Sequence, residues 1–161
     1  MILDRIIKDC GTVATAGNTA VEISAVCNDS RKVTPGALFV AVKGYASDGH
    51  SFIRTAAEKG AVAVIYEDQE IADVQLEGIE GITLVKVESS RYALAIAAAN
   101  FYDNPSHKLT LVGITGTNGK TTTVTLLYRM FTGLGYSCGL LSTIANYVGS
   151  RGSEAVNTTS D

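Results

Sequence analysis

The most constraining feature of the chain is a glycine-rich stretch at residues 109–123, which reads L-T-L-V-G-I-T-G-T-N-G-K-T-T-T. Residues 109–114 form an apolar, β-branched run that is typical of a buried strand. Gly116 and Gly119 allow a sharp turn because neither residue has a Cβ atom. Apolar residues with helical spacing follow Lys120. A strand, a glycine loop and a helix in this order predict an α/β fold with a phosphate-binding loop.

Such a loop binds phosphate through backbone N–H groups and the positive end of the following helix. Lys120 adds a positive charge, and Thr121 offers a hydroxyl group to Mg²⁺. We therefore expect the stretch to bind a nucleoside triphosphate. The strict motif G-x-x-x-x-G-K-[ST] is not met, because Ile114 occupies the position of its first glycine. The alternative is a glycine-rich turn without a ligand. The predicted nucleotide-binding residues are Gly116, Thr117, Asn118, Gly119, Lys120, Thr121 and Thr122.

Composition excludes several classes of protein. The 161 residues suffice for one ordinary domain or two small ones, and 46% hydrophobic residues allow a packed core. The net charge is −3 and there is no basic run, so we expect no nucleic-acid partner. No apolar stretch approaches the roughly 20 residues that cross a bilayer, so we expect no membrane insertion.

The cysteines and the N-terminus indicate a cytoplasmic protein. Cys10, Cys27 and Cys138 are odd in number, widely spaced and in no C-x-x-C pair, which favours reduced thiols. Residues 1–10 predict a short amphipathic helix, because charges interrupt the apolar run that a signal peptide needs. Neither His50 nor His107 has neighbours at metal-ligand spacing, so we expect no protein-only metal site.

Residues 1–88 predict a small α/β domain, because apolar strands alternate with a helical segment. Residues 11–18 are expected to form a loop of small residues, and the acidic residues 67–81 a surface segment. The expected strands are 21–27, 37–42, 61–66 and 82–87, and the expected helix between them is 51–59.

Residues 89–161 predict the beginning of a second, nucleotide-binding domain. An alanine-rich helix over 89–102, with Ser89 or Ser90 as its N-cap, is expected to lead into it. A strand is expected at 137–143, followed by a polar, glycine-containing tail at 144–161. A doubly wound sheet around a phosphate loop needs about five strands, and only two are predicted here. We therefore expect an incomplete domain, without a second acidic ligand for Mg²⁺.

Three stretches of the chain resemble the Mur ligase family of peptidoglycan synthesis. The loop V-G-I-T-G-T-N-G-K-T-T-T is similar to that family's phosphate loop and shares its departure from the strict motif. The D-S-R, P-G-x-L-F-V-A and D-G-H motifs between residues 29 and 50 resemble the nucleotide-sugar-binding domain of the tripeptide-forming and final-step members. The closing Asn157-Thr158-Thr159 resembles the tripeptide-forming members, many of which have proline where this chain has Ser160.

The resemblance implies an ATP-dependent ligase. ATP would phosphorylate the terminal carboxylate of UDP-N-acetylmuramoyl-L-alanyl-D-glutamate, and the amine of meso-diaminopimelate or L-lysine would attack the acyl phosphate. Lys120 and Thr121 would be the catalytic residues, through charge neutralisation and Mg²⁺ binding. Since the resemblance covers only the first part of a full-length ligase, we expect these 161 residues to be inactive alone.

Residues matched to the family's motifs would hold the muramoyl substrate. Asn28 and Ser30 would contact the uridine end, while Tyr45, Ala46 and Ser47 would line the diphosphate. Asn157, Thr158 and Thr159 would hold the sugar-peptide end. Local alternatives exist, because Asp29-Ser30-Arg31 could be a simple turn, Asp48 could cap the next helix, and the Thr-Thr pair could lie in a frayed tail.

Other functions share parts of these motifs. The final-step ligase, which adds D-alanyl-D-alanine, shares D-S-R and P-G-x-L-F-V-A. Folylpolyglutamate and cyanophycin synthetases share T-G-T-N-G-K but not the D-S-R domain. Two non-enzymatic functions are also possible interpretations. One is a nucleotide-sugar-binding module without catalytic activity, and the other is an interaction domain with a vestigial glycine loop.

Overall fold

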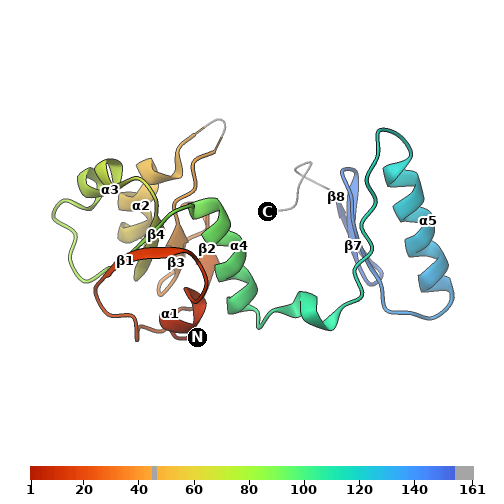
Figure 1. Cartoon of the computed structure of the whole chain (residues 1–161), viewed down its shortest axis with the longest axis horizontal. Helices are drawn as coiled ribbons and strands as arrows, with labels where there is room; N and C mark the ends of the chain where they lie inside the picture. Colours follow the sequence, from red (N-terminus) through yellow and green to blue (C-terminus); the bar gives the residue numbers. More distant parts are fainter. Residues whose placement is uncertain (45–46, 155–161) are drawn as a thin grey trace. The chain divides into compact units, whose positions relative to one another are not determined.

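The computed structural model describes residues 1–44 and 47–154. The chain divides by packing into two compact units, Met1–Leu109 and the residues from Thr110 onward (Figure 1). Each unit has its own sheet, and each is described separately below.

The first unit is built on a five-stranded sheet in the order β1-β5-β4-β3-β2. Strands β2 to β5 are parallel, and β1 pairs antiparallel with β5 at one edge. The mixed α/β fold class is therefore as the sequence predicts. The strands are β1 (Thr12–Ala16), β2 (Val26–Cys27), β3 (Leu38–Val40), β4 (Ala63–Tyr66) and β5 (Thr83–Val87).

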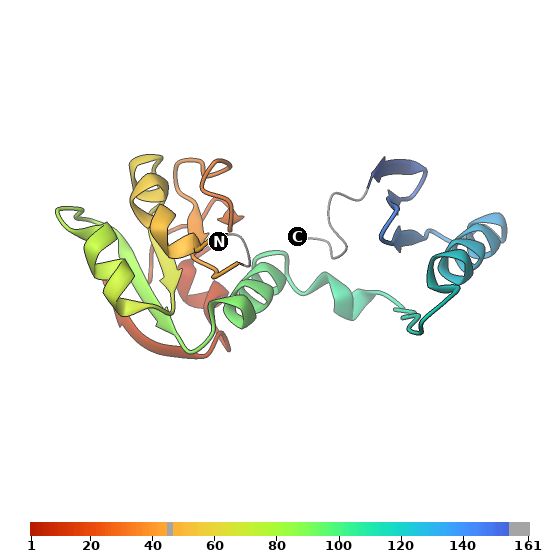
Figure 2. The ribbon, with the colours of Figure 1, turned by 90° about the horizontal axis from the view of Figure 1, so that it is seen from above.

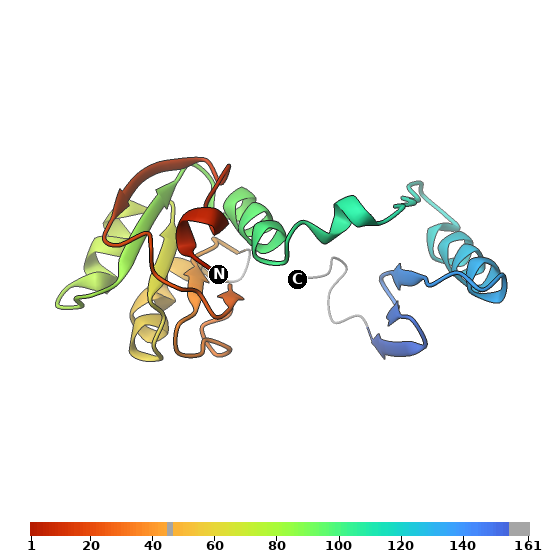
Figure 3. The same ribbon diagram turned by 90° about the horizontal axis from the view of Figure 1, so that it is seen from below.

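Helices cover both faces of this sheet, as Figures 2 and 3 show. Helices α1 (Leu3–Ile6) and α4 (Ser90–Phe101) pack together on one face. The 3₁₀-helix η1 (Gly49–Phe52), α2 (Ile53–Glu58) and α3 (Gln69–Leu76) cover the other. A last 3₁₀-helix, η2 (Pro105–Lys108), follows α4.

The central strands are buried on both faces because helices lie above and below them. Leu38 and Val40 of β3 point into the core beneath α1 and α4, while Phe39 between them points into the core beneath α2. In β4, Ile65 and Val64 divide between the two cores in the same way. These two apolar layers fix the positions of the loops that leave the sheet.

Three segments of the first unit differ from the sequence-based expectation. Of the strand expected at 21–27, only Val26–Cys27 forms a strand, β2. Residues 12–16 form the edge strand β1, not a loop; all five are exposed, so no inside–outside alternation marks the strand. The acidic segment contains helix α3, where the Asp68 side chain accepts a hydrogen bond from Ile71 N–H and caps the helix. Ala72 of this helix is buried.

Helix α4 packs with the first unit, so the division falls at Leu109 and not at residue 88. Asn100 on α4 donates hydrogen bonds from Nδ2 to the carbonyl oxygens of Ile6 (3.0 Å) and Lys8 (2.8 Å). These bonds satisfy carbonyl groups at the end of α1, where no helical partner remains. Of the two predicted N-caps, Ser89 and Ser90, the structure has Ser89, whose Oγ accepts a hydrogen bond from the Tyr92 N–H.

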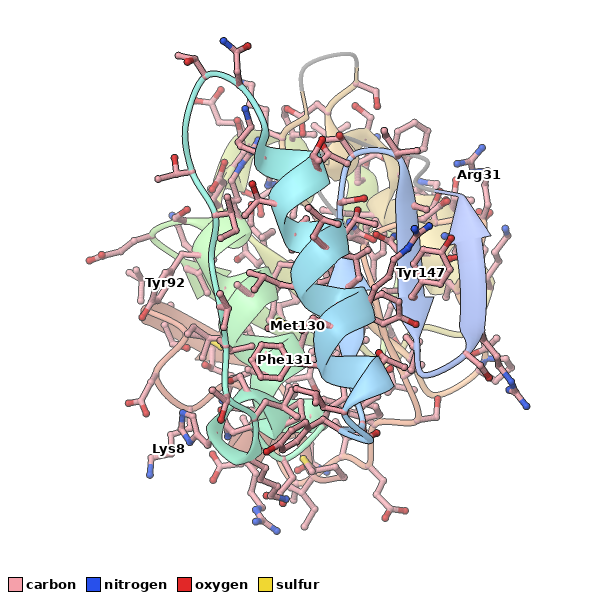
Figure 4. The ribbon with its side chains drawn as sticks, turned by 90° about the vertical axis from the view of Figure 1, so that its right-hand side faces the viewer. Lys8, Arg31, Tyr92, Met130, Phe131 and Tyr147 are labelled. Atoms are coloured by element: carbon pink, nitrogen blue, oxygen red, sulfur yellow. The ribbon has the colours of Figure 1, made fainter. Side chains whose placement is uncertain are left out.

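The second unit consists of helix α5 and a three-stranded antiparallel sheet. The helix is α5 (Lys120–Gly133), and the strands, in the order β6-β7-β8, are β6 (Gly139–Leu141), β7 (Ala145–Val148) and β8 (Arg151–Glu154). Tyr128 of α5 stacks on Tyr147 of β7 with ring centroids 5.3 Å apart, and its hydroxyl donates to the Gly149 carbonyl oxygen (2.6 Å). Figure 4 shows Met130 and Phe131 on α5 and Tyr147 beside it.

The strand predicted at 109–114 is wrong, because the structure has extended coil there without ladder partners. Leu111 and Val112 are 72% and 60% exposed. An apolar run forms a buried strand only where neighbouring strands satisfy its backbone and cover its side chains. In contrast, residues 145–154, expected to be a tail without strands, form the β7–β8 hairpin. Among the described residues, no helix has the length and apolarity to span a membrane.

Candidate functional site

The predicted phosphate loop is a glycine turn that ends at the first residue of α5. Gly119 has a φ of +77° and Gly116 a φ of +144°, conformations that residues with a Cβ atom rarely adopt. The glycines are therefore required by backbone conformation, since a Cβ on Gly119 would meet nothing within 4 Å. No side chain caps the helix at Gly119. The first N–H groups of α5 thus have no side-chain acceptor, which suits an anionic ligand.

The Lys120 side chain folds back over this loop. Its Nζ donates to the carbonyl oxygens of Gly116 (2.5 Å) and Thr117 (3.3 Å). This arrangement concentrates positive charge beside the amino end of the helix, where the helix dipole has the same sign. Thr121 is half-buried in the first turn, whereas the rest of the loop is exposed. The turn therefore brings together a cation and N–H groups without side-chain acceptors, while binding of phosphate and of a metal ion by these residues stays a prediction.

Three further candidate residues, Asn28, Ser30 and Ser47, lie in loops at the carboxyl edge of the first sheet. Parallel strands end at one edge, and the loops that follow them form the usual ligand site of open α/β sheets. Asn28 directly follows β2, and Ser47 lies in the connection that follows β3. Both residues are exposed, and Ser30 is half-buried. The predicted residues Tyr45, Ala46, Asn157, Thr158 and Thr159 lie outside the described residues.

Asp29, Ser30 and Arg31 form a tight polar turn. The Asp29 carboxylate accepts from the Arg31 backbone N–H and from its Nε (both 2.9 Å to Oδ1) and Nη2 (2.9 Å to Oδ2). The Lys59 ammonium donates to the Ser30 carbonyl oxygen (3.0 Å). The alternative of a locally bonded turn is therefore confirmed for Asp29. The Arg31 guanidinium remains exposed and extends from the surface (Figure 4).

Replacing Arg31 by alanine is expected to raise the pKa of Asp29 from about 2 toward the ordinary 3.8. Hydrogen bonds from the Arg31 side chain, and then from its backbone N–H, hold this pKa low. The contribution of these Asp29–Arg31 contacts to folding stability is thus present above pH 3.8 and is lost as the pH falls through about 2. Carbon-detected NMR titration measures the pKa; Lys8→Ala, which removes a distant cation, should leave it unchanged. An unchanged pKa in Arg31→Ala would contradict the assignment.

Asp48, Gly49 and His50 close the loop that follows β3. Asp48 Oδ1 accepts from the His50 backbone N–H (3.0 Å) and lies 2.6 Å from His50 Nδ1. Asp48 therefore caps η1, as the local alternative predicted. Burial alone would raise the pKa of Asp48, but the two hydrogen bonds from His50 and the charge of Lys43 lower it overall. Gly49 N–H donates to the Val42 carbonyl oxygen (3.0 Å).

Sequence reasoning missed the contacts of two side chains, His50 and Arg91, that support this loop. His50 is fully buried and accepts at Nε2 from the backbone N–H groups of Glu67 (3.1 Å) and Asp68 (3.2 Å). Arg91 Nη2 donates to the Lys43 carbonyl oxygen (3.1 Å). The only sequence signal is the cluster Asp48-Gly49-His50, which identifies a cap but not its distant partners.

The described residues contain no group of three His, Cys, Asp or Glu side chains arranged to hold a metal ion. All three cysteines are free thiols. Burial is the main reason that the pKa of Cys10 is raised to about 11, with a smaller contribution from Asp9. This buried thiol is therefore unreactive at neutral pH.

Comparison with known proteins identifies the family of the chain. Residues 22–102 match the family described as "Mur ligase family, catalytic domain". The UDP-N-acetylmuramoyl-L-alanyl-D-glutamate–2,6-diaminopimelate ligase of Cytophaga hutchinsonii is 48% identical over all 161 residues, which cover 32% of that protein. The corresponding ligase 1 of Clostridium acetobutylicum is 46% identical over 99% of this chain and 32% of its own length. The chain thus spans about a third of these relatives.

Solved structures give the same family. The MurF ligase of Thermotoga maritima in complex with ADP superposes with a TM-score of 0.52 and 36% identity, over 70% of this chain and 24% of that one. A UDP-N-acetylmuramoylalanyl-D-glutamyl-2,6-diaminopimelate–D-alanyl-D-alanyl ligase from Acinetobacter baumannii has a TM-score of 0.52 and 28% identity, over 70% and 23% of the two chains. Half of the sequence matches the family and the fold agrees with it, so the chain belongs to the Mur ligase family.

Proposed function

We propose that the chain is the first part of a cytoplasmic, ATP-dependent ligase of peptidoglycan synthesis. The proposed reaction adds meso-diaminopimelate to UDP-N-acetylmuramoyl-L-alanyl-D-glutamate. The observation that carries this proposal is the 48% identity, over the whole chain, to a ligase named for these two substrates. L-Lysine is the alternative amino acid.

The phosphate loop supports the use of ATP. Uncapped N–H groups at the start of α5 and the Lys120 ammonium would bind the β- and γ-phosphates, displacing Lys120 from the carbonyl oxygens of Gly116 and Thr117. Thr121 would hold Mg²⁺, which neutralises charge on the phosphates during transfer. The γ-phosphoryl group would pass to the terminal carboxylate of the substrate, and the amine would then displace phosphate from the acyl phosphate.

The carboxyl edge of the first sheet supports binding of the nucleotide-sugar. Asn28 and Ser30 would contact the uridine, and Tyr45, Ala46 and Ser47 the diphosphate. The sugar-peptide end would lie against Asn157, Thr158 and Thr159. Lys59 donates a hydrogen bond to the turn that carries Ser30, and Asp48, next to Ser47, accepts one from the His50 N–H, so both Ser30 and Ser47 adjoin polar contacts that need no ligand.

A second candidate is the final-step ligase, because the solved structures that match 70% of this chain include ligases of that type. Their identities of 36% and 28% are lower than the 48% and 46% of the diaminopimelate ligases. The closing Asn-Thr-Thr sequence also favours the tripeptide-forming enzyme.

Calorimetric titration of the 161-residue chain tests the proposal. The muramoyl dipeptide, UDP-N-acetylmuramoyl-L-alanyl-D-glutamate, is expected to bind with a smaller Kd than the corresponding tripeptide, because the dipeptide is the substrate of the proposed reaction. Tighter binding of the tripeptide would favour the final-step ligase instead. Absence of heat from both ligands, with a folded protein by circular dichroism, would contradict nucleotide-sugar binding.

A matched pair of variants locates the site in the same experiment. Asn28→Ala should weaken dipeptide binding about fivefold, the effect of one lost hydrogen bond. Asn18→Ala is the control, since Asn18 lies before β2 and its side chain accepts from the Ala20 N–H. Equal affinities of the two variants would remove Asn28 from the site.

A further inference from the structure

His50 is a fully buried histidine whose two ring nitrogens have different partners. Nδ1 lies 2.6 Å from Asp48 Oδ1, and Nε2 faces the backbone N–H groups of Glu67 and Asp68 at 3.1 and 3.2 Å. A backbone N–H can only donate, so Nε2 must be an acceptor without a proton. An ionised carboxylate can only accept, so Nδ1 must carry the proton. The contacts therefore select the neutral Nδ1–H tautomer.

The ring joins two parts of the first unit at the carboxyl edge of its sheet. Through Asp48 it contacts the base of the loop after β3, which consists of the described residues Lys43, Gly44, Ser47 and Asp48. Lys43 and Asp48 form a β-bridge, and Gly44 N–H donates to the Ser47 carbonyl oxygen (3.0 Å). Through Nε2 the ring contacts the segment that follows β4.

Charged groups continue this network on both sides of the ring. The Glu67 carboxylate accepts from the Ser90 N–H (2.7 Å) at the start of α4, and the Asp68 carboxylate caps α3. Arg91 of α4 donates to the Lys43 carbonyl oxygen. The loop base is thus held against β4 and α4 by fixed polar contacts, with His50 as the buried link.

We propose that His50, as the neutral Nδ1–H tautomer, is a positioning residue that holds the loop base Lys43, Gly44, Ser47 and Asp48 in place for the nucleotide-sugar. This role rests on the proposed function, because it assigns the loop to substrate binding. His50 is buried and acts through Asp48 and the backbone. Its removal is therefore expected to increase loop motion and to weaken substrate binding.

Nitrogen-detected NMR of the 161-residue chain tests the tautomer directly. The chain has two histidines, and the exposed His107 serves as an internal reference. His50 is expected to show a protonated Nδ1 and an unprotonated Nε2 at neutral pH. A protonated Nε2 in the folded protein would overturn the proposal without any variant or ligand.

Two substitutions separate the two ring contacts. His50→Asn retains a donor near the position of Nδ1 but has no atom at Nε2, whereas His50→Gln retains an acceptor near the position of Nε2. In His50→Asn, amide exchange at Glu67, Asp68 and Gly44 is expected to accelerate about tenfold or more, because the half-buried N–H groups of Glu67 and Asp68 lose their acceptor. His50→Gln should restore much of the protection at Glu67 and Asp68. His107→Asn is the matched control and should change none of these rates.

Dipeptide titration of the same variants measures the consequence for binding. The Kd is expected to rise about tenfold in His50→Asn and less in His50→Gln, in parallel with Gly44 exchange. If wild-type chain does not bind the dipeptide, the proposed function fails, while Gly44 exchange still decides whether His50 holds the loop. Unchanged Gly44 exchange in His50→Asn, or failure of both variants to fold, would show that His50 only stabilises the unit.

Discussion

Replacing Gly49 by alanine is expected to destabilise the first unit by about 3 kcal/mol or more, a larger effect than most substitutions cause. A Cβ atom at this position would lie 2.6 Å from the Val42 carbonyl oxygen and 2.7 Å from the Val42 nitrogen. Both atoms belong to the backbone that continues from β3, so no side-chain rotation relieves the overlap. The midpoint temperature of thermal unfolding of the first unit, measured by circular dichroism, should fall by roughly 15 °C.

The control for this substitution is Gly133→Ala. Gly133 has ordinary backbone geometry, and an added Cβ would meet nothing within 4 Å. Its substitution should leave the unfolding of the first unit unchanged. If Gly49→Ala unfolds at the same midpoint temperature as the wild type, the result would contradict the close packing of Gly49 against the Val42 backbone.

Replacing Lys120 by methionine is expected to weaken binding of Mg²⁺·ATP by roughly tenfold to a hundredfold, the range for loss of a charged hydrogen-bonding partner. Methionine keeps much of the apolar stem but removes the charge. It also removes the hydrogen bonds to the carbonyl oxygens of Gly116 and Thr117, so the free loop loses its internal contacts. Titration with Mg²⁺·ATP measures the affinity, and circular dichroism checks the fold.

Lys108→Met removes the same charge outside the loop. Lys108 is exposed and pairs with Asp103 (3.0 Å), an arrangement that contributes little in water. Its variant should bind Mg²⁺·ATP like the wild type. Equal affinities of the Lys120 and Lys108 variants would exclude Lys120 from the nucleotide site.

The buried parts of the first fold could be predicted from sequence because burial leaves a compositional signal. The apolar runs that became β3, β4 and β5 can be satisfied only inside a covered sheet. The edge strand β1 gave no such signal, because its small residues are exposed and its pairing depends on β5, far away in sequence. The apolar run at 109–114 led to the wrong prediction of a buried strand. Its composition is that of a strand, but composition does not supply the neighbouring strands that a buried strand needs.

The glycine turn before α5 could be predicted because Gly116 and Gly119 lie close together in sequence and determine the backbone geometry locally. Phosphate binding by this turn stays a prediction. The polar network around His50 could not be predicted, because its partners Glu67 and Asp68 are 17 and 18 residues away and contribute backbone N–H groups. Any residue except proline has such a group, so no sequence pattern marks it.

The edges of the first sheet affect how the protein behaves at high concentration. The β2 edge has only two residues, and the β1 edge has an irregular register between Thr12 and Ala14. A regular strand from another molecule would find few consecutive backbone groups to pair with at either edge. Pairing of sheet edges between molecules is therefore disfavoured. The first unit should resist this route to aggregation even when no other protein covers its sheet edges.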